Sequence, residues 1–122
     1  MWNLALDENA EPSRLGRRPT TDMNKGLLTI RSDRMDDVTF ESGFFSLGHF
    51  SKFVDPNAYR INSNTITDEI ESVAFQNPDS TIVLVVNSRV NEDKKVRINW
   101  ASQSFQVKIP AKGAATFKFL PK

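Results

Sequence analysis

The sequence contains no cysteine, which excludes disulfide bonds, thiol catalysis and zinc sites built on cysteine. It contains a single histidine, His49, and one imidazole cannot build a zinc site without further ligands. The 5 glycines are scattered along the chain and form no phosphate-binding loop. We therefore expect no metal and no cofactor.

Neither sign of charge dominates the composition. The 16 basic and 15 acidic residues give a net charge of +1, and no basic surplus points to nucleic acid or to an anionic membrane. No apolar run is long enough to span a bilayer, and the first residues lack the pattern of a signal peptide. We expect no nucleic-acid partner and no membrane insertion, while the cellular compartment stays open.

The second half of the chain has the pattern of short β-strands. From Ala58 onward, apolar and polar residues alternate in short runs separated by turn residues. This spacing predicts a mainly β fold, an antiparallel β-sandwich of about six to eight strands over residues 55–122. The runs are Ala58–Asn62, Glu69–Asn77, Ser80–Ser88, Lys94–Trp100, Ser104–Pro110 and Ala114–Leu120.

One turn and one strand are especially clear in this half. The sequence Asn77-Pro78-Asp79-Ser80 places proline at the second position of a type I turn, which predicts a hairpin between the two flanking runs. The run Thr81–Val86 is almost entirely apolar, so we expect it to be the most buried strand.

An aromatic stretch precedes the strands. Within Gly43–Val54, "GFFSLGHFSKFV", apolar residues recur three and four positions apart, as on one face of an α-helix. This spacing predicts one amphipathic helix over residues 38–54, in the N-terminal half. We expect Phe44, Leu47 and Phe50 to face the sandwich or a partner.

Residues 1–37 are polar and irregular by comparison. The alternation within Trp2–Leu6 predicts a short strand, and Leu27–Ile30 predicts another. The residues between these two runs are rich in proline, glycine, asparagine, aspartate and arginine, which indicates a long loop.

The residues alone indicate no catalytic constellation. Ser46 lies three positions before His49, but no third group is placed to orient the imidazole, so we interpret His49 as a structural residue bonded to a carbonyl. Acids that are neighbours along a strand point to opposite faces and form no acid/base couple by themselves. We assign to a solvated surface the acids Asp7, Glu8, Asp36, Asp37, Glu69 and Glu71 and the arginines Arg14, Arg17 and Arg18.

Two motifs carry a family resemblance. "WNLALDE" at Trp2–Glu8 and "LGHFSKFV" at Leu47–Val54 together resemble the C-terminal part of glycoside hydrolase family 30, the glucosylceramidase-like enzymes. The segments "DEIESVAFQNPDSTIVLVVNSR" at Asp68–Arg89 and "SFQVKIPAKGAATFKF" at Ser104–Phe119 resemble the strands and turns that follow in that family. The resemblance covers most of the chain.

The resemblance implies a place for each segment in a longer enzyme. Family members have a (β/α)8 barrel with an attached β-sandwich, which strands from the N-terminus of the protein complete. Residues 1–37 would be the end of the last barrel strand and the loop after it, residues 38–54 the last barrel helix, and residues 55–122 the sandwich. The family's two catalytic glutamates would lie upstream of Met1, so the resemblance implies that this chain is non-catalytic by itself.

One substrate-binding residue follows from the resemblance. Trp2 would line the sugar pocket, where a ring can pack on the apolar face of a sugar. The loop after it departs from the family, which often has Gly-Gly-Pro-Asn and an aromatic there. This chain reads "NAEPSRLGRRP", with Arg14, Leu15 and Arg17. We therefore keep the substrate as the wider class of β-glycosides.

Two alternatives to the fragment of a glycosidase remain open. A stand-alone carbohydrate-binding sandwich would present exposed coplanar aromatics, for which Trp100 and Tyr59 are the candidates. A structural or interaction module would present an apolar patch without affinity for sugar. A sandwich without its barrel also has an open sheet edge, which predicts a homodimer or a monomer whose residues 1–35 add a strand to that edge.

Overall fold

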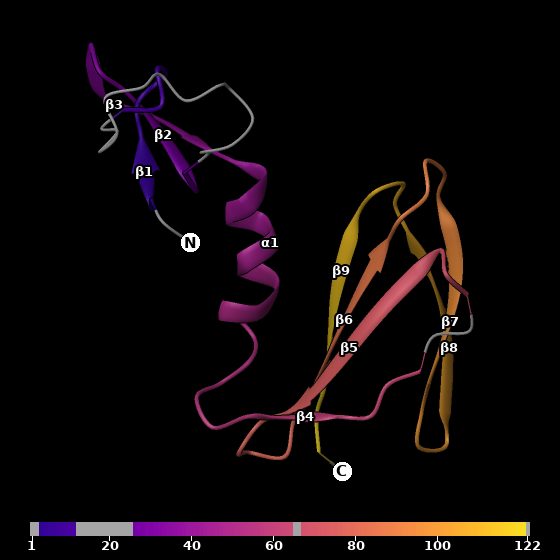
Figure 1. The fold of residues 1–122 in the computed structure, drawn as a ribbon. Helices are drawn as coiled ribbons and strands as arrows, with labels where there is room; N and C mark the ends of the chain where they lie inside the picture. Colours follow the sequence, from indigo (N-terminus) through magenta and orange to yellow (C-terminus); the bar gives the residue numbers. More distant parts are fainter. Residues whose placement is uncertain (1–2, 12–25, 65–66, 122) are drawn as a thin grey trace. The chain divides into compact units, whose positions relative to one another are not determined.

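A computed structural model describes residues 3–11, 26–64 and 67–121 (Figure 1). The chain divides into two compact units, Met1–Gly48 and His49–Lys122. The helix α1, Ser42–Ser51, begins in the first unit and ends in the second. Within the described residues, no helix is long and apolar enough to cross a membrane.

The first unit contains a small three-stranded sheet in the order β1-β2-β3. Its strands are β1 (Ala5–Leu6), β2 (Leu28–Arg31) and β3 (Arg34–Phe40), with β1 parallel to β2 and β3 antiparallel to β2. A Cβ on Gly26 would lie 3.0 Å from the carbonyl oxygen of Leu28 and 3.2 Å from the amide nitrogen of Leu6. Glycine at this position therefore lets β1 and β2 approach each other.

The helix begins later than its predicted start at residue 38. Residues Arg34–Phe40 form strand β3, which turns back on β2 through Ser32 and Asp33. Valine, threonine and phenylalanine at the end of β3 favour an extended backbone, and the pairing with β2 outweighs the helical spacing of Phe40. Helix α1 occupies the middle of the predicted range.

The second unit is the predicted β-sandwich. A four-stranded sheet has the order β4-β5-β6-β9, and a separate two-stranded hairpin is formed by β7 and β8 (Figure 1). The strands are β4 (Tyr59–Ile61), β5 (Ile70–Gln76), β6 (Ile82–Ser88), β7 (Lys94–Trp100), β8 (Gln103–Ile109) and β9 (Ala114–Phe119). All pairs in this unit are antiparallel, which confirms the predicted fold class.

The core of the sandwich lies between the sheet and the hairpin. Ile70 of β5, Val86 of β6 and Ile109 of β8 are buried together. Five partly buried side chains surround them, from β6, β7, β8 and β9: Leu84, Val96, Val107, Ala115 and Phe117. Alternate residues of each strand supply these side chains, which is why the period-two pattern of the sequence located the strands correctly.

The hairpin predicted around Asn77 is present. Gln76 of β5 pairs with Ile82 of β6, and the amide of Ser80 donates to the carbonyl oxygen of Asn77 at 2.9 Å. Ser80 has a φ of 66°, the left-handed conformation that commonly follows a type I turn in a hairpin loop. Strand β6 is buried at five of its seven residues, so the expectation that it is the most buried strand is also confirmed.

The predicted addition of residues 1–35 to the edge of the sandwich is not found in the described residues. The two apolar runs proposed for this role form β1 and β2, and these pair with each other and with β3. Pairing within the first unit satisfies their backbone groups locally, without a strand from the sandwich.

One buried hydroxyl has no hydrogen-bond partner in the described residues. Ser88, at the end of β6, is 2% exposed and its Oγ atom is unpaired. Thr81 at the start of this strand is 3% exposed, but its hydroxyl donates to Asp79 Oδ1 at 2.6 Å. Thr81 and Ser88 therefore allow a comparison of two buried hydroxyls at the two ends of one strand: that of Thr81 makes a hydrogen bond, and that of Ser88 makes none in the described residues.

We predict opposite effects for the two substitutions. Ser88→Ala should leave the free energy of unfolding unchanged or raise it by up to about 1 kcal/mol, because it removes an unsatisfied polar group. Thr81→Ala should lower it by about 1–3 kcal/mol, because it removes a buried hydroxyl that is bonded. Urea unfolding of both variants measures this, and a larger loss for Ser88→Ala would show that its hydroxyl has a partner.

Candidate functional site

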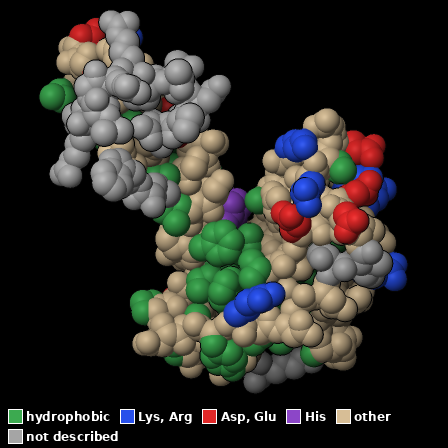
Figure 2. All heavy atoms as spheres, in the orientation of Figure 1, with side chains coloured by type: hydrophobic (Ala, Val, Ile, Leu, Met, Phe, Trp, Pro, Cys, Tyr) green, Lys and Arg blue, Asp and Glu red, His purple; other side chains and the backbone are tan. Residues whose placement is uncertain are grey.

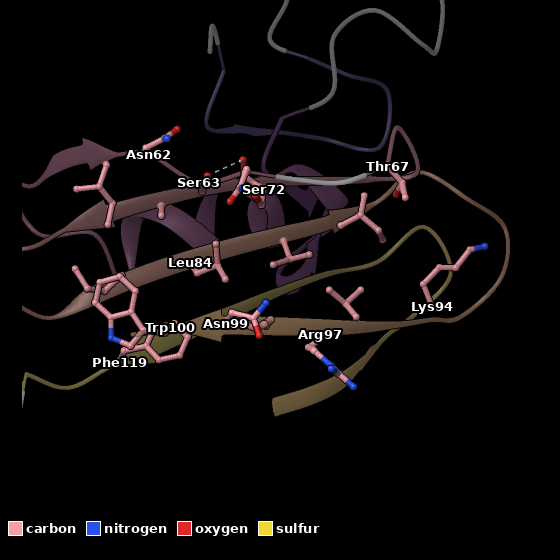
Figure 3. Close-up of a pocket in the computed structure, with 18 of the residues that line it drawn as sticks. Asn62, Ser63, Thr67, Ser72, Leu84, Lys94, Arg97, Asn99, Trp100 and Phe119 are labelled. Atoms are coloured by element: carbon pink, nitrogen blue, oxygen red, sulfur yellow. Dashed lines mark hydrogen bonds between the residues drawn. The ribbon is translucent and has the colours of Figure 1, made fainter. Parts of the chain in front are cut away.

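A cleft lies within the sandwich. It has a volume of about 440 Å³ and is lined by the inner faces of β4, β5 and β6 and by strand β7 (Figure 3). Its floor is apolar, and its lining includes Ile61, Ile70, Ala74, Ile82, Leu84 and Val86. Its walls carry the polar side chains of Asn62, Ser63, Asn64, Ser72, Arg97 and Asn99.

The two ends of the cleft differ chemically. Trp100 and Phe119 lie together at one end, with ring centroids 5.9 Å apart, and Lys94 lies at the other (Figure 3). Lys94 Nζ contacts Glu69 Oε2 at 3.0 Å and Glu92 Oε1 at 2.7 Å. The hydrogen bond to Glu92, followed by that to Glu69, raises the pKa of Lys94. This end of the cleft is therefore occupied by ion pairs.

The edge of the hairpin borders this cleft. Strand β7 pairs only with β8 in the described structure, so the backbone groups of its other edge have no strand partner. Strand β4 has three residues, so it covers only the Ala74–Gln76 end of β5. The cleft therefore has an apolar floor and is flanked by strand edges, which are the features that accept an added strand.

The cleft does not have the aromatic platform expected of a stand-alone carbohydrate-binding sandwich. Trp100 is 37% exposed, but its ring packs on Phe119 at an interplanar angle of 33°. Tyr59 is 56% exposed and does not line the cleft. The two predicted aromatics therefore do not line this cleft together.

Helix α1 carries a second apolar surface (Figure 2). Phe44, Leu47 and Phe50 are exposed to 39%, 43% and 39%, and of the three Phe50 meets a sandwich residue, Phe75 of β5. Phe44 packs on Phe40 and Phe45, at centroid distances of 4.6 and 5.6 Å. An exposed aromatic surface of this kind is typical of a contact site for another surface.

The serine and histidine of the helix are engaged separately. Ser46 Oγ donates to the carbonyl oxygen of Ser42 at 3.1 Å, a common contact of serine within a helix. His49 is half-buried, and its Nδ1 lies 2.8 Å from the hydroxyl of Thr116 on β9. Its partner is thus a hydroxyl where we predicted a carbonyl, while the structural interpretation of His49 agrees with this contact.

Glu8 is held firmly next to β1. Its Oε1 accepts a hydrogen bond from the Ser32 hydroxyl at 2.6 Å, and its Oε2 accepts one from the Ser32 amide at 2.9 Å. These bonds, the side-chain bond first, lower the pKa of Glu8 from 4.5 to about 2. Glu8 therefore joins the turn after β1 to the β2–β3 turn as a carboxylate.

Other candidate acids also have structural partners. Asp7 Oδ1 accepts hydrogen bonds from the amides of Asn9 and Glu11, at 2.8 and 2.7 Å. Glu71 pairs with Arg89 at 3.3 Å. Among the described residues, no group of three or more histidine, cysteine, aspartate or glutamate side chains could hold a metal ion.

Several predicted site residues lie outside the described residues. These are the proposed pocket residue Trp2 and the loop residues Arg14, Leu15, Arg17 and Arg18. The cleft was missed in the sequence because its polar wall residues are separated by up to about forty positions. No local pattern in the sequence would have found it, because the cleft depends on how strands distant in the chain come together.

Comparison with known proteins gives one family match. The model of the β-sandwich domain of glycosyl hydrolase family 30 matches residues 57–117. The chain is 34% identical to the lysosomal acid glucosylceramidase of Mus musculus over 101 residues, which are 80% of this chain and 18% of that protein. The chain therefore spans less than a fifth of the length of this relative.

Two solved structures share the fold. SrfJ from Salmonella typhimurium matches 98% of this chain with a TM-score of 0.86, at 24% identity and over 25% of its own length. The endo-β1,6-glucanase BT3312 matches 98% of this chain with a TM-score of 0.84, at 24% identity and over 26% of its own length. At this identity the likeness shows the fold alone.

The Glu8 contact gives a prediction for acid titration. The pKa of Glu8 is about 2 in the folded chain and 4.5 as its ordinary value. The contact therefore stabilises the first unit fully above pH 4.5, and this stabilisation is lost as the pH falls through about 2. Ser32→Ala should raise the pKa of Glu8 toward 4.5, which NMR titration of the carboxyl group measures. Asp93, whose lowered pKa comes first from Lys108, should not change and serves as the control.

Proposed function

This chain belongs to glycoside hydrolase family 30, as its β-sandwich domain, and from that premise we propose that it is the C-terminal portion of a longer retaining β-glycosidase. The match over residues 57–117 carries the proposal. In this proposal residues 1–37 include the end of the last barrel strand, and residues 38–54 include the last helix of a (β/α)8 barrel. The barrel is then the main partner of the chain, within one polypeptide.

The open sides of the chain support a partner of this kind. A barrel would cover the exposed aromatic rings of α1, and strands from elsewhere in the longer protein would fill the cleft beside β7. Completion of the cleft would pair the open edge of β7 and bury the half-buried Ile61 of β4. Without these parts, the same open surfaces favour the homodimer that we also propose for the isolated chain.

The chain is proposed to be inactive by itself. Retaining glycosidases need two carboxyl groups about 5–5.5 Å apart, one as acid/base and one as nucleophile. The carboxylates of Glu8, Glu69 and Glu71 are each held by a hydrogen bond or an ion pair that serves the local structure. The proposed catalytic pair therefore belongs to the barrel.

Two experiments test this function. The reading frame upstream of the Met1 codon should encode a (β/α)8 barrel with two glutamates at strand ends, and an immediate stop codon would contradict the proposal. The longer protein should hydrolyse an activated aryl β-glycoside, while the 122-residue chain should not. Turnover by the pure 122-residue chain would place the catalytic acids within it.

Trp2 is the proposed sugar-binding residue. Its ring would pack on the apolar face of the substrate sugar, and burial of a large apolar side chain contributes about 1.5–3 kcal/mol. In the longer enzyme, Trp2→Ala should therefore lower kcat/KM by about tenfold to a hundredfold, with Trp2→Phe less affected. Trp100→Phe is the control, because we assign Trp100 no role in the sugar pocket.

The surface of α1 gives a prediction that separates the isolated chain from the longer protein. A Cβ on Gly48 would meet no atom within 4 Å, so Gly48→Ala should raise the free energy of unfolding of the 122-residue chain by about 0.5–1 kcal/mol. If a barrel packs closely on this helix, the same substitution should destabilise the longer protein.

Gly43→Ala is the matched control for this test. A Cβ on Gly43 would lie 3.2 Å from Leu27 Cδ2, so the gain in helix propensity is offset by crowding in both proteins. Thermal unfolding of all four variants measures the difference. Equal stabilisation by Gly48→Ala in the long and short proteins would mean that no surface approaches this side of α1.

A further inference from the structure

A buried asparagine joins two segments that are far apart in the sequence. Asn77 follows β5 and is 1% exposed. Its Oδ1 accepts a hydrogen bond from the amide of Asp55 at 3.0 Å, and its Nδ2 donates to the carbonyl oxygen of Phe53 at 3.0 Å. Asp55 and Phe53 lie just after α1, so the side chain of Asn77 ties the segment that leaves the helix to the β5–β6 turn.

The turn holds this side chain in place. Asn77 Nδ2 also donates to Thr81 Oγ1 at 3.1 Å, and the amide of Asn77 donates to the carbonyl oxygen of Thr81 at 2.9 Å. Asp79 Oδ1 in turn accepts hydrogen bonds from the hydroxyl and the amide of Thr81, at 2.6 and 2.9 Å. The orientation of the Asn77 amide is therefore fixed by backbone and side-chain contacts together.

The end of α1 has two further anchors in the same unit. His49 contacts Thr116 on β9, at 2.8 Å between Nδ1 and Oγ1. The ring of Phe50 meets Phe75 of β5 edge-on, at a centroid distance of 6.2 Å. These contacts hold the last turn of the helix. Among the described residues, the backbone just after it bonds to Asn77 and to near neighbours, as in the bond from Val54 to Phe50.

We propose that Asn77 is a latch that fixes the path of the chain from α1 into the sandwich. One side chain must accept from Asp55 and donate to Phe53 at the same time, which a primary amide does and an ionised carboxylate cannot do. The side chain acts by positioning the segment between the helix and the sandwich. This inference concerns contacts within residues 49–122 and does not depend on the proposed glycosidase function.

Amide hydrogen exchange on the full chain tests the latch. In Asn77→Ala the amide of Asp55 loses its acceptor, and its exchange should accelerate about tenfold to a hundredfold relative to the amides of β6. The matched control is Ile109→Val, a distant substitution at a side chain that is 0% exposed. It should lower global stability, so that the exchange rates of the Asp55 amide and of the β6 amides rise by the same factor.

Asn77→Asp gives a second readout that depends on protonation. An ionised carboxylate cannot donate to the carbonyl oxygen of Phe53, whereas a protonated carboxyl group can. The charged groups of the neighbouring segments are Asp55 and Asp79, and Lys118 acts on Asp79. The negative charges of these two acids favour the protonated form of the carboxyl group introduced at position 77.

The destabilisation in Asn77→Asp should therefore shrink as the pH falls from 7 through the raised pKa of the new carboxyl group. Asn62→Asp, at an exposed position of the same unit, should show no such recovery when its melting temperature is followed over the same range. If Asn77→Ala does not fold, the pH profile of Asn77→Asp decides the test, because this variant keeps an acceptor for the Asp55 amide and loses only the donor to Phe53. The latch is refuted if Asp55 exchanges in step with β6 in Asn77→Ala, or if both aspartate variants have the same pH profile.

Discussion

The four-stranded sheet of this chain is wider than the hairpin that covers it. Both faces of β6 are apolar, so the sheet needs material on each side, and burial of apolar area is the main favourable term that holds such a domain together. On one face, the β7–β8 hairpin leaves a cleft that is lined by β4, β5, β6 and β7. On the other face, Phe50 of α1 reaches β5. The open cleft and the exposed rings of the helix both follow from this shortage of covering elements.

The parts of the fold that depend on local pattern were predictable from the sequence. All six strands of the sandwich and the Asn77 hairpin follow from period-two alternation and turn chemistry, which act within a few residues. Strand β3 was not predicted, because Phe40 fits the helical spacing of Phe44 and Leu47 while its actual partner, β2, is distant in sequence. The two-residue turn at Ala101 and Ser102 also gives little signal, since Ala101 adopts a φ of 51° that glycine or asparagine would normally indicate.

Less of the candidate site was predictable than of the fold. The family resemblance rests on motifs that are continuous in the sequence, and the match to the sandwich domain agrees with it. The cleft is lined by residues of β4, β5, β6 and β7, and a local sequence pattern carries no direct sign of how these strands come together. The partners of Glu8 and Asn77 are likewise tertiary: Ser32 and Asp55 lie more than twenty positions away, so no local rule connects them.

The apolar character of β6 on both faces has a consequence for how the sheet finds its correct alignment. Ile82, Leu84 and Val86 face the hairpin side, while Val83 and Val85 face the other side, and four of these five side chains are buried. A slip of one residue normally exposes the apolar side chains of a strand, but here it would exchange one apolar set for another. Hydrophobic burial therefore selects only weakly among alignments of β6. The polar turn from Asn77 to Thr81 must supply most of that selection, so the same few hydrogen bonds that close the hairpin also protect a β-rich apolar segment from mispairing.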